Sequence, residues 1–425
     1  MKKTIRTLFL NTNEEKRVRD AYLWTMLSGL LYSGSTFVMF WAVSAACSVA
    51  EGGVFTIAMS MGQQLVTIGY FNVRTFQVSD VREEFSFSEY IVFRSITCTL
   101  MCLVGACWIL AKGYTGEKAA AVVVMILFKL AEAWADVLQG RYQQKERLDV
   151  AGKCVFWETA AFLLVFLVTL LLTKSLTAAL LAMLAAYVLS VLLLEGNLIG
   201  AFGNVRWKLE PARQRKLFLS CFPLFLNSFL MMYINNCAKY AIEASYGDEM
   251  LGYFNILFMP AFVINLLGGF LLKPMLTSMS LRYQEGNLQA FRKLLKKQAF
   301  FILLLTILCV GGAALLGIPV LEFVYRTDLT GYRGAMCILV TGGAFTALYT
   351  MFQYAIIIMR HQYACLIACA VTACAAFFLM PVLVRSKGIL GAAGGHFLLM
   401  ALLSSIYLLM TIYYLKKAAK AQTGN

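Results

Sequence analysis

The feature of this sequence that most constrains its fold is a series of long apolar runs, such as residues 160–173 and 177–194, which contain no charged residue. Soluble domains are roughly half apolar and a quarter charged. Here 60% of the 425 residues are hydrophobic, only 14% are charged, and the mean hydropathy is +0.74. A lipid bilayer is the solvent that accepts so much apolar surface. Because barrel strands alternate apolar and polar residues and these runs do not, the sequence predicts an all-α membrane protein.

A membrane-spanning helix needs about 20 apolar residues. By that criterion the sequence predicts twelve transmembrane helices in two six-helix lobes, residues 1–203 and 204–425. The predicted spans are 22–48, 53–73, 90–111, 119–138, 154–173, 177–200, 216–241, 251–272, 298–317, 335–358, 364–384 and 389–415.

The net charge of +15 comes from Lys and Arg residues in short clusters between the apolar segments. Cytoplasmic loops of membrane proteins collect such residues, so this pattern favours a topological signal over nucleic-acid binding. With twelve spans, 26 of the 37 basic residues fall on the side that holds both termini, and seven fall on the other side. Both termini are therefore predicted to be cytoplasmic.

Several functional classes are excluded by missing motifs. The twelve Cys lie mostly in apolar segments without a CxxC pair, and His361 and His396 are the only two His, so no metal site is expected. No nucleotide-binding loop of the GxxxxGK[ST] type is present. Neither a resident cofactor nor an enzymatic activity is predicted. No small-residue cleavage site follows the basic N-terminus, so no cleavable signal peptide is expected.

An internal repeat relates the two predicted lobes. The segment GGVFTIA (53–59) opens the second span, and LGYFNIL (251–257) opens the eighth. Aligning them gives an offset of 199, which places Arg74 on Lys273, each at the cytoplasmic end of its helix. Two related six-helix halves are typical of transporters. The repeat predicts pseudo-two-fold symmetry with a central cavity between the lobes.

Charged residues inside the fourth span form one stripe. Lys129, Glu132 and Asp136 stand at i, i+3 and i+7, so they share one helix face. A charged face cannot point at lipid, which makes Lys129 a candidate for a cationic cavity and the two acids candidates for ion coupling. The alternative is an interior structural salt bridge between Lys129 and Glu132.

Further polar and charged positions in the spans suggest a site for an anion. The cavity candidates are Gln63, Asn235, Lys239 and Asn265, and the cationic ring predicted at the cytoplasmic mouth is Arg74, Arg94, Lys273 and Arg360. Guanidinium and ammonium groups bind phosphate well. The alternative for the ring is ordinary anchoring by basic side chains that reach the interface.

Two acids lie in the fifth and sixth spans. Glu158 and Glu195 are candidates for exchanging protons or binding Na⁺ in a coupling cycle. The alternative is that each pairs with a Lys on a neighbouring helix.

Four stretches distributed over both lobes carry a family resemblance. They are NVRTFQVSDVREEFSFSEY (72–90), DVLQGRYQQKERLDVAGK (136–153), AKYAIEASYGDEMLGYFNILFMPAFVINLL (238–267) and LLGIPVLEFVYRTDLTGY (315–332). These stretches, and their order relative to the twelve spans, make the chain resemble one known family. It is the polysaccharide transporter (oligosaccharide flippase, Wzx-type) family of the multidrug/oligosaccharidyl-lipid/polysaccharide exporter superfamily, in particular its Gram-positive branch.

The resemblance implies a V-shaped pair of lobes that works by alternating access in the bacterial cytoplasmic membrane. It implies export of undecaprenyl-pyrophosphate-linked glycans from the inner to the outer leaflet for capsule or exopolysaccharide synthesis. A polysaccharide polymerase and assembly proteins are the implied partners. The positions that match the family's cationic cavity are Arg74, Lys239 and Lys273, with Asp136 as a matched acid. Lipid II flippases of the superfamily carry two further helices beyond the twelve predicted here.

Three other functions remain open from the residues. A drug or small-cation antiporter of the same superfamily would line its cavity with acids and aromatic rings, whereas these stripes hold cations and amides. The second of these functions is a non-transport scaffold in glycan assembly. A polytopic glycosyltransferase or polymerase is disfavoured because the predicted loops reach only about 16–18 residues, too short for a catalytic domain.

Overall fold

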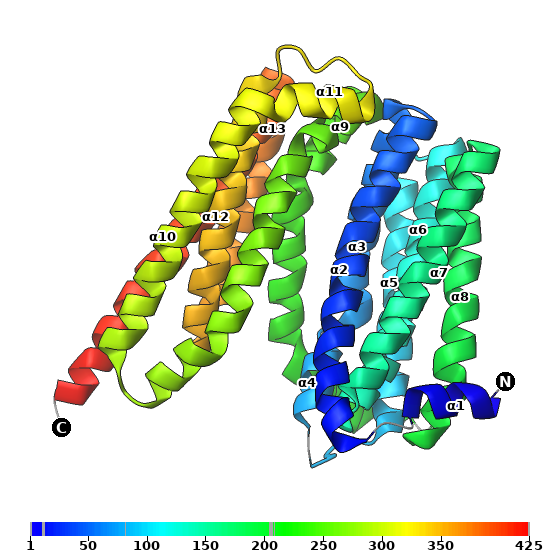
Figure 1. The fold of residues 1–425 in the computed structure, drawn as a ribbon, viewed down its shortest axis with the longest axis vertical. Helices are drawn as coiled ribbons and strands as arrows, with labels where there is room; N and C mark the ends of the chain where they lie inside the picture. Colours follow the sequence, from blue (N-terminus) through cyan, green and yellow to red (C-terminus); the bar gives the residue numbers. More distant parts are fainter. Residues whose placement is uncertain (1, 11–12, 81, 204–206, 208, 424–425) are drawn as a thin grey trace. The chain divides into compact units, whose positions relative to one another are not determined.

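The structure is a computed structural model in which every described regular element is a helix (Figure 1). It describes residues 2–10, 13–80, 82–203, 207 and 209–423, and within these only the backbone of residues 2–5, 262–277 and 421–423. The prediction of an all-α protein is confirmed for this part of the chain.

The helices follow one another with short connections. The first group comprises α1 (Lys2–Leu10), α2 (Glu14–Ala46), α3 (Val49–Tyr70), α4 (Val73–Ser79), α5 (Phe87–Lys112), α6 (Gly116–Gln144), α7 (Leu148–Thr173), α8 (Leu176–Leu198) and the 3₁₀ turn η1 (Ile199–Ala201). The second group comprises α9 (Pro211–Gln284), α10 (Leu288–Gly312), the π-helical turn η2 (Ala313–Gly317), α11 (Ile318–Tyr325), α12 (Arg333–Ile358) and α13 (Gln362–Thr423).

The two longest elements, α9 and α13, are each interrupted by a glycine. Gly247 has φ 80° and ψ −170°, and Gly388 has φ 53° and ψ −131°. A residue with a Cβ rarely adopts such angles, whereas glycine does so at little cost. Each element is therefore two helices that meet at a sharp turn, as the predicted spans on either side of each glycine require.

Every predicted span lies on a helix, and their ends follow local capping chemistry. The predicted span 90–111 is observed as Phe87–Lys112, which starts at a capping box between Ser86 and Glu89 and ends at Gly113 with φ 65°. Eight helices in the described residues are long and apolar enough to cross a membrane, with the broken helices counted as single elements. The count of twelve crossings and the pseudo-two-fold symmetry stay predictions.

The chain divides into two compact units, residues 1–229 and 230–425, and the predicted lobes 1–203 and 204–425 stay a prediction. The first part of α9 packs on the first unit. Leu217 and Cys221 lie in a buried cluster with Phe71 and Phe93 of α3 and α5. In addition, Gln64 donates a hydrogen bond to the Phe229 carbonyl oxygen at 3.1 Å.

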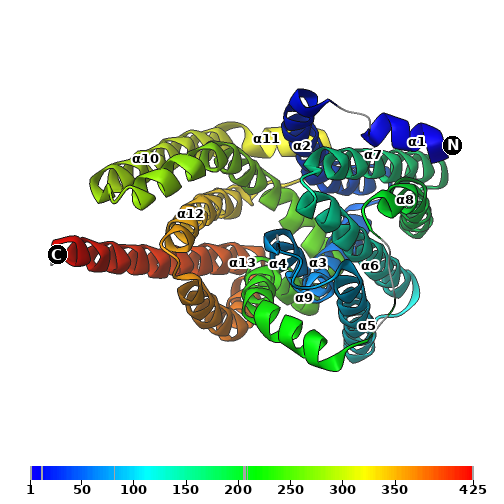
Figure 2. The ribbon, with the colours of Figure 1, turned by 90° about the horizontal axis from the view of Figure 1, so that it is seen from below.

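In the first unit, α3 packs against α2, α5 and α6, while α6 also packs against α4, α7 and α8 (Figure 2). These two helices therefore have neighbours on most sides, and α3 is buried along most of its length. Lys129 and Glu132 on α6 are buried, so these charged side chains must find their partners inside the bundle.

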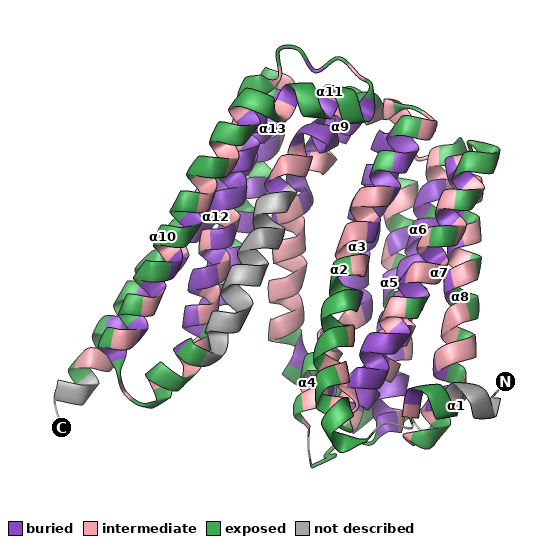
Figure 3. Cartoon of the chain, in the orientation of Figure 1, coloured by how far each residue is buried: buried purple, intermediate pink, exposed green. Residues whose placement is uncertain are grey.

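Several other helices expose broad apolar faces. On α10 much of the surface is exposed (Figure 3). Its exposed side chains include Leu303, Leu304, Ile307 and Leu308. Exposed apolar area of this extent does not persist on a monomer in water. The distribution fits a chain whose outer surface is solvated by lipid.

Candidate functional site

The centre of the polar network in the first unit is Asp136 on α6. Its Oδ1 accepts from Arg74 Nη1 at 3.1 Å and its Oδ2 accepts from Arg94 Nη2 at 2.7 Å. Arg74 comes from α4 and Arg94 from α5, so one carboxylate joins three helices. Two guanidinium groups share this single carboxylate, and the group of three carries one net positive charge.

Arg74 lies beside a pocket of about 490 Å³. Its side chain is 31% exposed, and its guanidinium also donates to Gln143 Oε1 at 3.2–3.3 Å and to Gln139 Oε1 at 3.4 Å. The pocket is lined by Tyr70, Asn72, Arg74, Thr75, Val78, Ser79, Asp136 and Gln143. The structure thus places the predicted substrate cation Arg74 at an accessible polar pocket.

Arg94 is placed differently from the prediction. It was expected in a cationic ring at an open mouth, but its side chain has 0% exposure and donates to Asp136 and to the Gly69 carbonyl oxygen. A guanidinium inside a helix bundle needs acceptors at its own depth, and these two supply them. The prediction for Arg94 is corrected to a buried ion pair that joins α5 to α3 and α6.

For Lys129 and Glu132 the structure shows the alternative, a buried salt bridge, and so corrects the predicted roles of Lys129 as a cavity cation and Glu132 as a coupling acid. The ammonium group lies 2.6 Å from Glu132 Oε2, and both side chains are buried. Tyr32 of α2 completes the group, because its hydroxyl donates to Glu132 Oε1 at 2.9 Å and accepts from Lys129 at 3.1 Å. Both charges are neutralised inside the bundle, which is the arrangement of the structural alternative considered for this pair.

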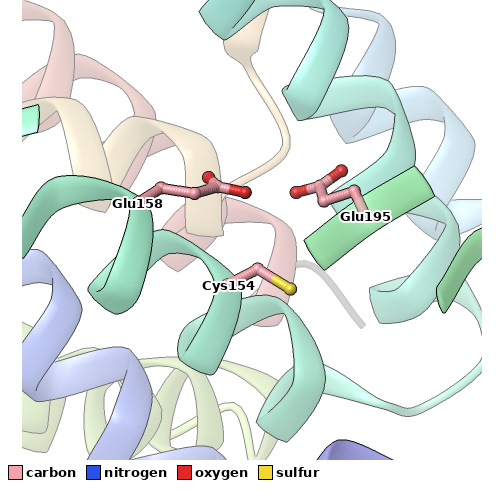
Figure 4. A group of neighbouring side chains, drawn as sticks. All are labelled: Cys154, Glu158 and Glu195. Carbon is pink, nitrogen blue, oxygen red and sulfur yellow. The ribbon is translucent and has the colours of Figure 1, made fainter. Parts of the chain in front are cut away.

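Two buried acids face each other between α7 and α8. Figure 4 shows the carboxyl groups of Glu158 and Glu195 pointing toward one another, with Cys154 beside them. Gln139 of α6 donates to Glu195 at 2.9 Å and to Glu158 at 3.4 Å. In the described part of the chain, neither acid has the Lys partner that the alternative reading expected.

In the second unit, Lys239 on α9 is partly buried. Its ammonium group donates to Asn236 Oδ1 at 3.2 Å and lies 5.7 Å from the Phe258 ring centroid. No carboxylate of the described residues forms an ion pair with it. The Phe258 ring also packs edge-on against His396 of α13, whose Nε2 has no partner among the described side chains. Within that part of the chain, Lys239 is a cation without a counter-ion.

The remaining predicted residues contribute less to these clusters. Asn235 hydrogen-bonds Tyr349 of α12. Gln63 is partly buried on α3, and Arg360 is exposed at the end of α12 with φ 63°. The side chains of Asn265 and Lys273 lie outside the described residues, so their predicted roles and the matching of Arg74 with Lys273 stay predictions.

Three residues of these clusters were missed by sequence reasoning: Tyr32, Gln139 and His396. Gln139 carried a usable signal, since it stands at i+3 from Asp136 and continues the charged stripe of α6. Tyr32 and His396 carried none, because each meets its partner across a helix interface that only the fold creates.

Outside the helices, the connection between α4 and α5 is tied to α6 by charge. Lys145 donates to Glu83, and this hydrogen bond, together with the charge of Arg141, holds the pKa of Glu83 below its usual range. The connection that follows α4, the helix of Arg74, is thereby held at Glu83 against the end of α6.

No family model and no curated protein matches the chain by sequence. Solved structures match along nearly its whole length. One is an inward-facing multidrug resistance MATE family transporter of the MOP superfamily, with TM-score 0.67, 14% identity, and coverage of 92% of this chain and 95% of that one. The lipid II flippase MurJ in an inward closed conformation gives TM-score 0.66, 14% identity, and coverage of 92% and 90%.

A third match is a MOP superfamily transporter from Pyrococcus furiosus, whose reverse polarity of the binding pocket suggests a different function. It gives TM-score 0.59, 13% identity, and coverage of 98% of both chains. The chain has the fold of MOP superfamily transporters. Together with its membrane-length apolar helices, this fold makes it a multi-pass membrane protein. Since the fold occurs in both multidrug transporters and a flippase, the substrate must be argued from the residues.

Proposed function

We propose that this protein is a flippase for lipid-linked oligosaccharides in the bacterial cytoplasmic membrane. It would move an undecaprenyl-pyrophosphate-linked glycan from the inner to the outer leaflet by alternating access, with both termini cytoplasmic. The lipid II flippase MurJ has a similar fold, so a lipid-linked substrate is compatible with this architecture. The residue chemistry selects between this function and cation export.

The observation that carries the proposal is the uncompensated charge of Lys239. A cation inside a membrane helix is costly unless an anion approaches it, and the described neighbours of Lys239 are the Asn236 amide and the Phe258 ring. A pyrophosphate head group would supply that anion. An organic cation would be repelled.

Arg74 supports the same substrate from the first unit. Its guanidinium lies at a pocket, and it shares Asp136 with Arg94, so the local charge stays positive. Guanidinium groups with several donors suit the oxygens of a phosphate. Both clusters therefore favour an anionic ligand, each by its own geometry.

The test is a leaflet-translocation assay in proteoliposomes with an undecaprenyl-pyrophosphate-linked oligosaccharide. The natural chain should translocate it, and Lys239→Gln should reduce the rate at least about tenfold, because a hydrogen bond to a charged group contributes about 1.5–3 kcal/mol. Lys174→Gln is the control, since Lys174 is an exposed residue at the end of α7. Equal translocation rates for the natural chain and Lys239→Gln would show that Lys239 does not bind the substrate.

A drug or small-cation antiporter is the second candidate, and Glu158 with Glu195 is the observation that favours it. Two buried acids without a basic partner are suited to binding cations. Proton-driven uptake of an organic cation into the same proteoliposomes, without any glycan translocation, would replace the flippase proposal. Absence of both activities with retained binding to a glycan polymerase would support a scaffold.

A further inference from the structure

Glu158 and Glu195 form a closed pair within the first unit. Their side chains are 1% and 0% exposed, and their oxygens lie, with Cys154 Sγ, within 4.8 Å of one another. One oxygen of each carboxyl group accepts from Gln139, while Glu158 Oε1 and Glu195 Oε2 have no hydrogen-bond partner. Two orphaned oxygens thus remain inside one buried cluster (Figure 4).

Two ionised carboxylates cannot remain this close in a dry interior without a cation between or beside them. Among the described residues neither forms an ion pair with Lys or Arg. One proton held between the two groups would remove the repulsion. It would also give a hydrogen bond to oxygens that otherwise have none, as in other buried carboxyl pairs that share a proton.

A metal ion fits the cluster less well than a proton. Calcium takes six to eight oxygen ligands and magnesium an octahedral shell that waters usually complete, whereas this buried cluster offers two carboxyl groups and a thiol. The Gln139 amide nitrogen donates to both acids, and its Oε1 accepts from Arg74 at 3.4 Å, which fixes this orientation. An N–H donor therefore occupies lone pairs that a metal would need.

Other titratable groups near the pair do not supply its missing positive charge. These groups are Cys154 and Lys153 on α7, Tyr187 on α8, Glu132 and Tyr142 on α6, Asp20 on α2, and Arg74 on α4. Lys153 pairs with Asp20, and Glu132 pairs with Lys129. Arg74 is near enough for its charge to act on Glu195, but its ion pair is with Asp136 and its hydrogen-bond connection to the acids runs through Gln139.

The same amide connects the acids to the pocket. Arg74 donates to Gln139 Oε1, and Gln139 Nε2 donates to both acids, so one side chain is hydrogen-bonded at both ends. An anion that draws Arg74 into the pocket would weaken the bond that orients Gln139. The acids would then lose the Gln139 hydrogen bond that stabilises their ionised form, and their proton affinity would rise.

We propose that Glu158 and Glu195 are a proton-binding site, and that Gln139 couples it to the anion at Arg74. The proton site stands on the buried pair alone. The coupling rests on the proposed function, because it requires that Arg74 bind an anionic head group. Binding of the anion and binding of the proton would then favour one another, as reciprocal linkage between two sites requires.

The first test is infrared spectroscopy of the purified full chain in detergent, following the carboxylic-acid carbonyl band against pH with deuterium exchange. The natural chain should show this band and its titration. Glu158→Gln and Glu195→Gln should each lower the midpoint by about one pH unit or more, a tenfold loss of proton affinity. The double variant should lose the band, whereas Glu117→Gln, at an exposed acid in the first turn of α6, should keep it.

A band absent between pH 5 and 8, or one that persists in a folded double variant, would overturn the proton site. So would a stoichiometric metal ion found by mass spectrometry in the natural chain and lost in the double variant. Size-exclusion profiles and thermal unfolding establish that each variant is folded. None of these results depends on transport, so failure of the proton site and failure of the flippase proposal are separable.

The second test adds inorganic pyrophosphate during the titration. The midpoint of the natural chain should rise, and Gln139→Leu should keep the band but abolish the rise. Arg74→Gln should also abolish it. If pyrophosphate binds to the natural chain but does not change the titration midpoint of the band, the coupling would be overturned and the proton site would stand.

Discussion

At the scale of single residues, the cations of the first unit occupy two kinds of surroundings. Lys129 and Arg94 have acids at hydrogen-bond distance and are fully enclosed. Such pairs are unfavourable to break, because removing one partner leaves a buried charge unbalanced. Arg74 combines an acid partner with access to a pocket, which is the combination that a ligand-binding cation needs.

Replacing Asp136 with Asn should strongly destabilise the protein. The change leaves two guanidinium groups without their shared carboxylate, one of them fully buried. Breaking a buried ion pair from one side costs about 3–5 kcal/mol. We expect a lower thermal unfolding midpoint in detergent, while Glu117→Gln, an exposed acid at the start of the same helix, should leave the midpoint unchanged. An unchanged midpoint in D136N would show that another group balances Arg94.

At the scale of helices, close packing depends on a few small residues. Helices in a membrane associate through van der Waals contact, and small residues let their backbones approach. Gly152 on α7 is such a position, since a Cβ there would lie 2.9 Å from backbone atoms of Trp24 and Thr25 on α2. A backbone cannot move aside as a flexible side chain can, so this contact sets how closely α2 and α7 approach.

Gly152→Ala should therefore destabilise the first unit by about 1–3 kcal/mol, the usual cost of overpacking. The matched control is Gly29→Ala on α2, where a Cβ would meet nothing within 4 Å. That change should be neutral or stabilising, because alanine favours helix more than glycine by about 1 kcal/mol. Thermal unfolding of both variants in the same detergent tests the pair, and equal midpoints would contradict the packing argument.

At the scale of the whole molecule, the outer helices carry apolar surface that water would not tolerate. On α10 the first turns differ, with exposed Lys293, Lys296 and Lys297 opposite buried Leu288 and Phe291. An amphipathic segment that continues into an apolar helix suits the membrane interface, where the basic groups meet anionic lipid. In the proposed topology this segment faces the cytoplasm.

The proposed orientation can be tested with reporter fusions. A fluorescent protein joined after Asn425 should fluoresce, and alkaline phosphatase joined there should be inactive, because both report a cytoplasmic position. Phosphatase joined after Thr115, between α5 and α6, should be active, since this connection is predicted to face outward. Active phosphatase at both sites would contradict twelve spans, since nine predicted crossings separate them; activity at the C-terminus alone would invert the proposed orientation.

The class of element and its solvent were readable from the sequence alone. Each predicted span lies on a helix, because a bilayer leaves the backbone no other way to satisfy its hydrogen bonds, whereas the short helices α1, α4 and α11 were not predicted as spans. The stripe of Lys129, Glu132 and Asp136 was equally readable, since helix geometry alone places them on one face.

Which charges neutralise one another depends on how the helices pack, and the sequence alone did not reveal it. Arg94 is a buried partner of Asp136 and not a mouth residue, because α5 brings it to the depth of that acid. Glu158 and Glu195 are 37 residues apart on separate helices, and no periodicity relates them. Their apposition, and the Gln139 amide between them and Arg74, exist because α6 packs against both α7 and α8. Pairing across helices depends on rotation and depth, which local sequence does not encode.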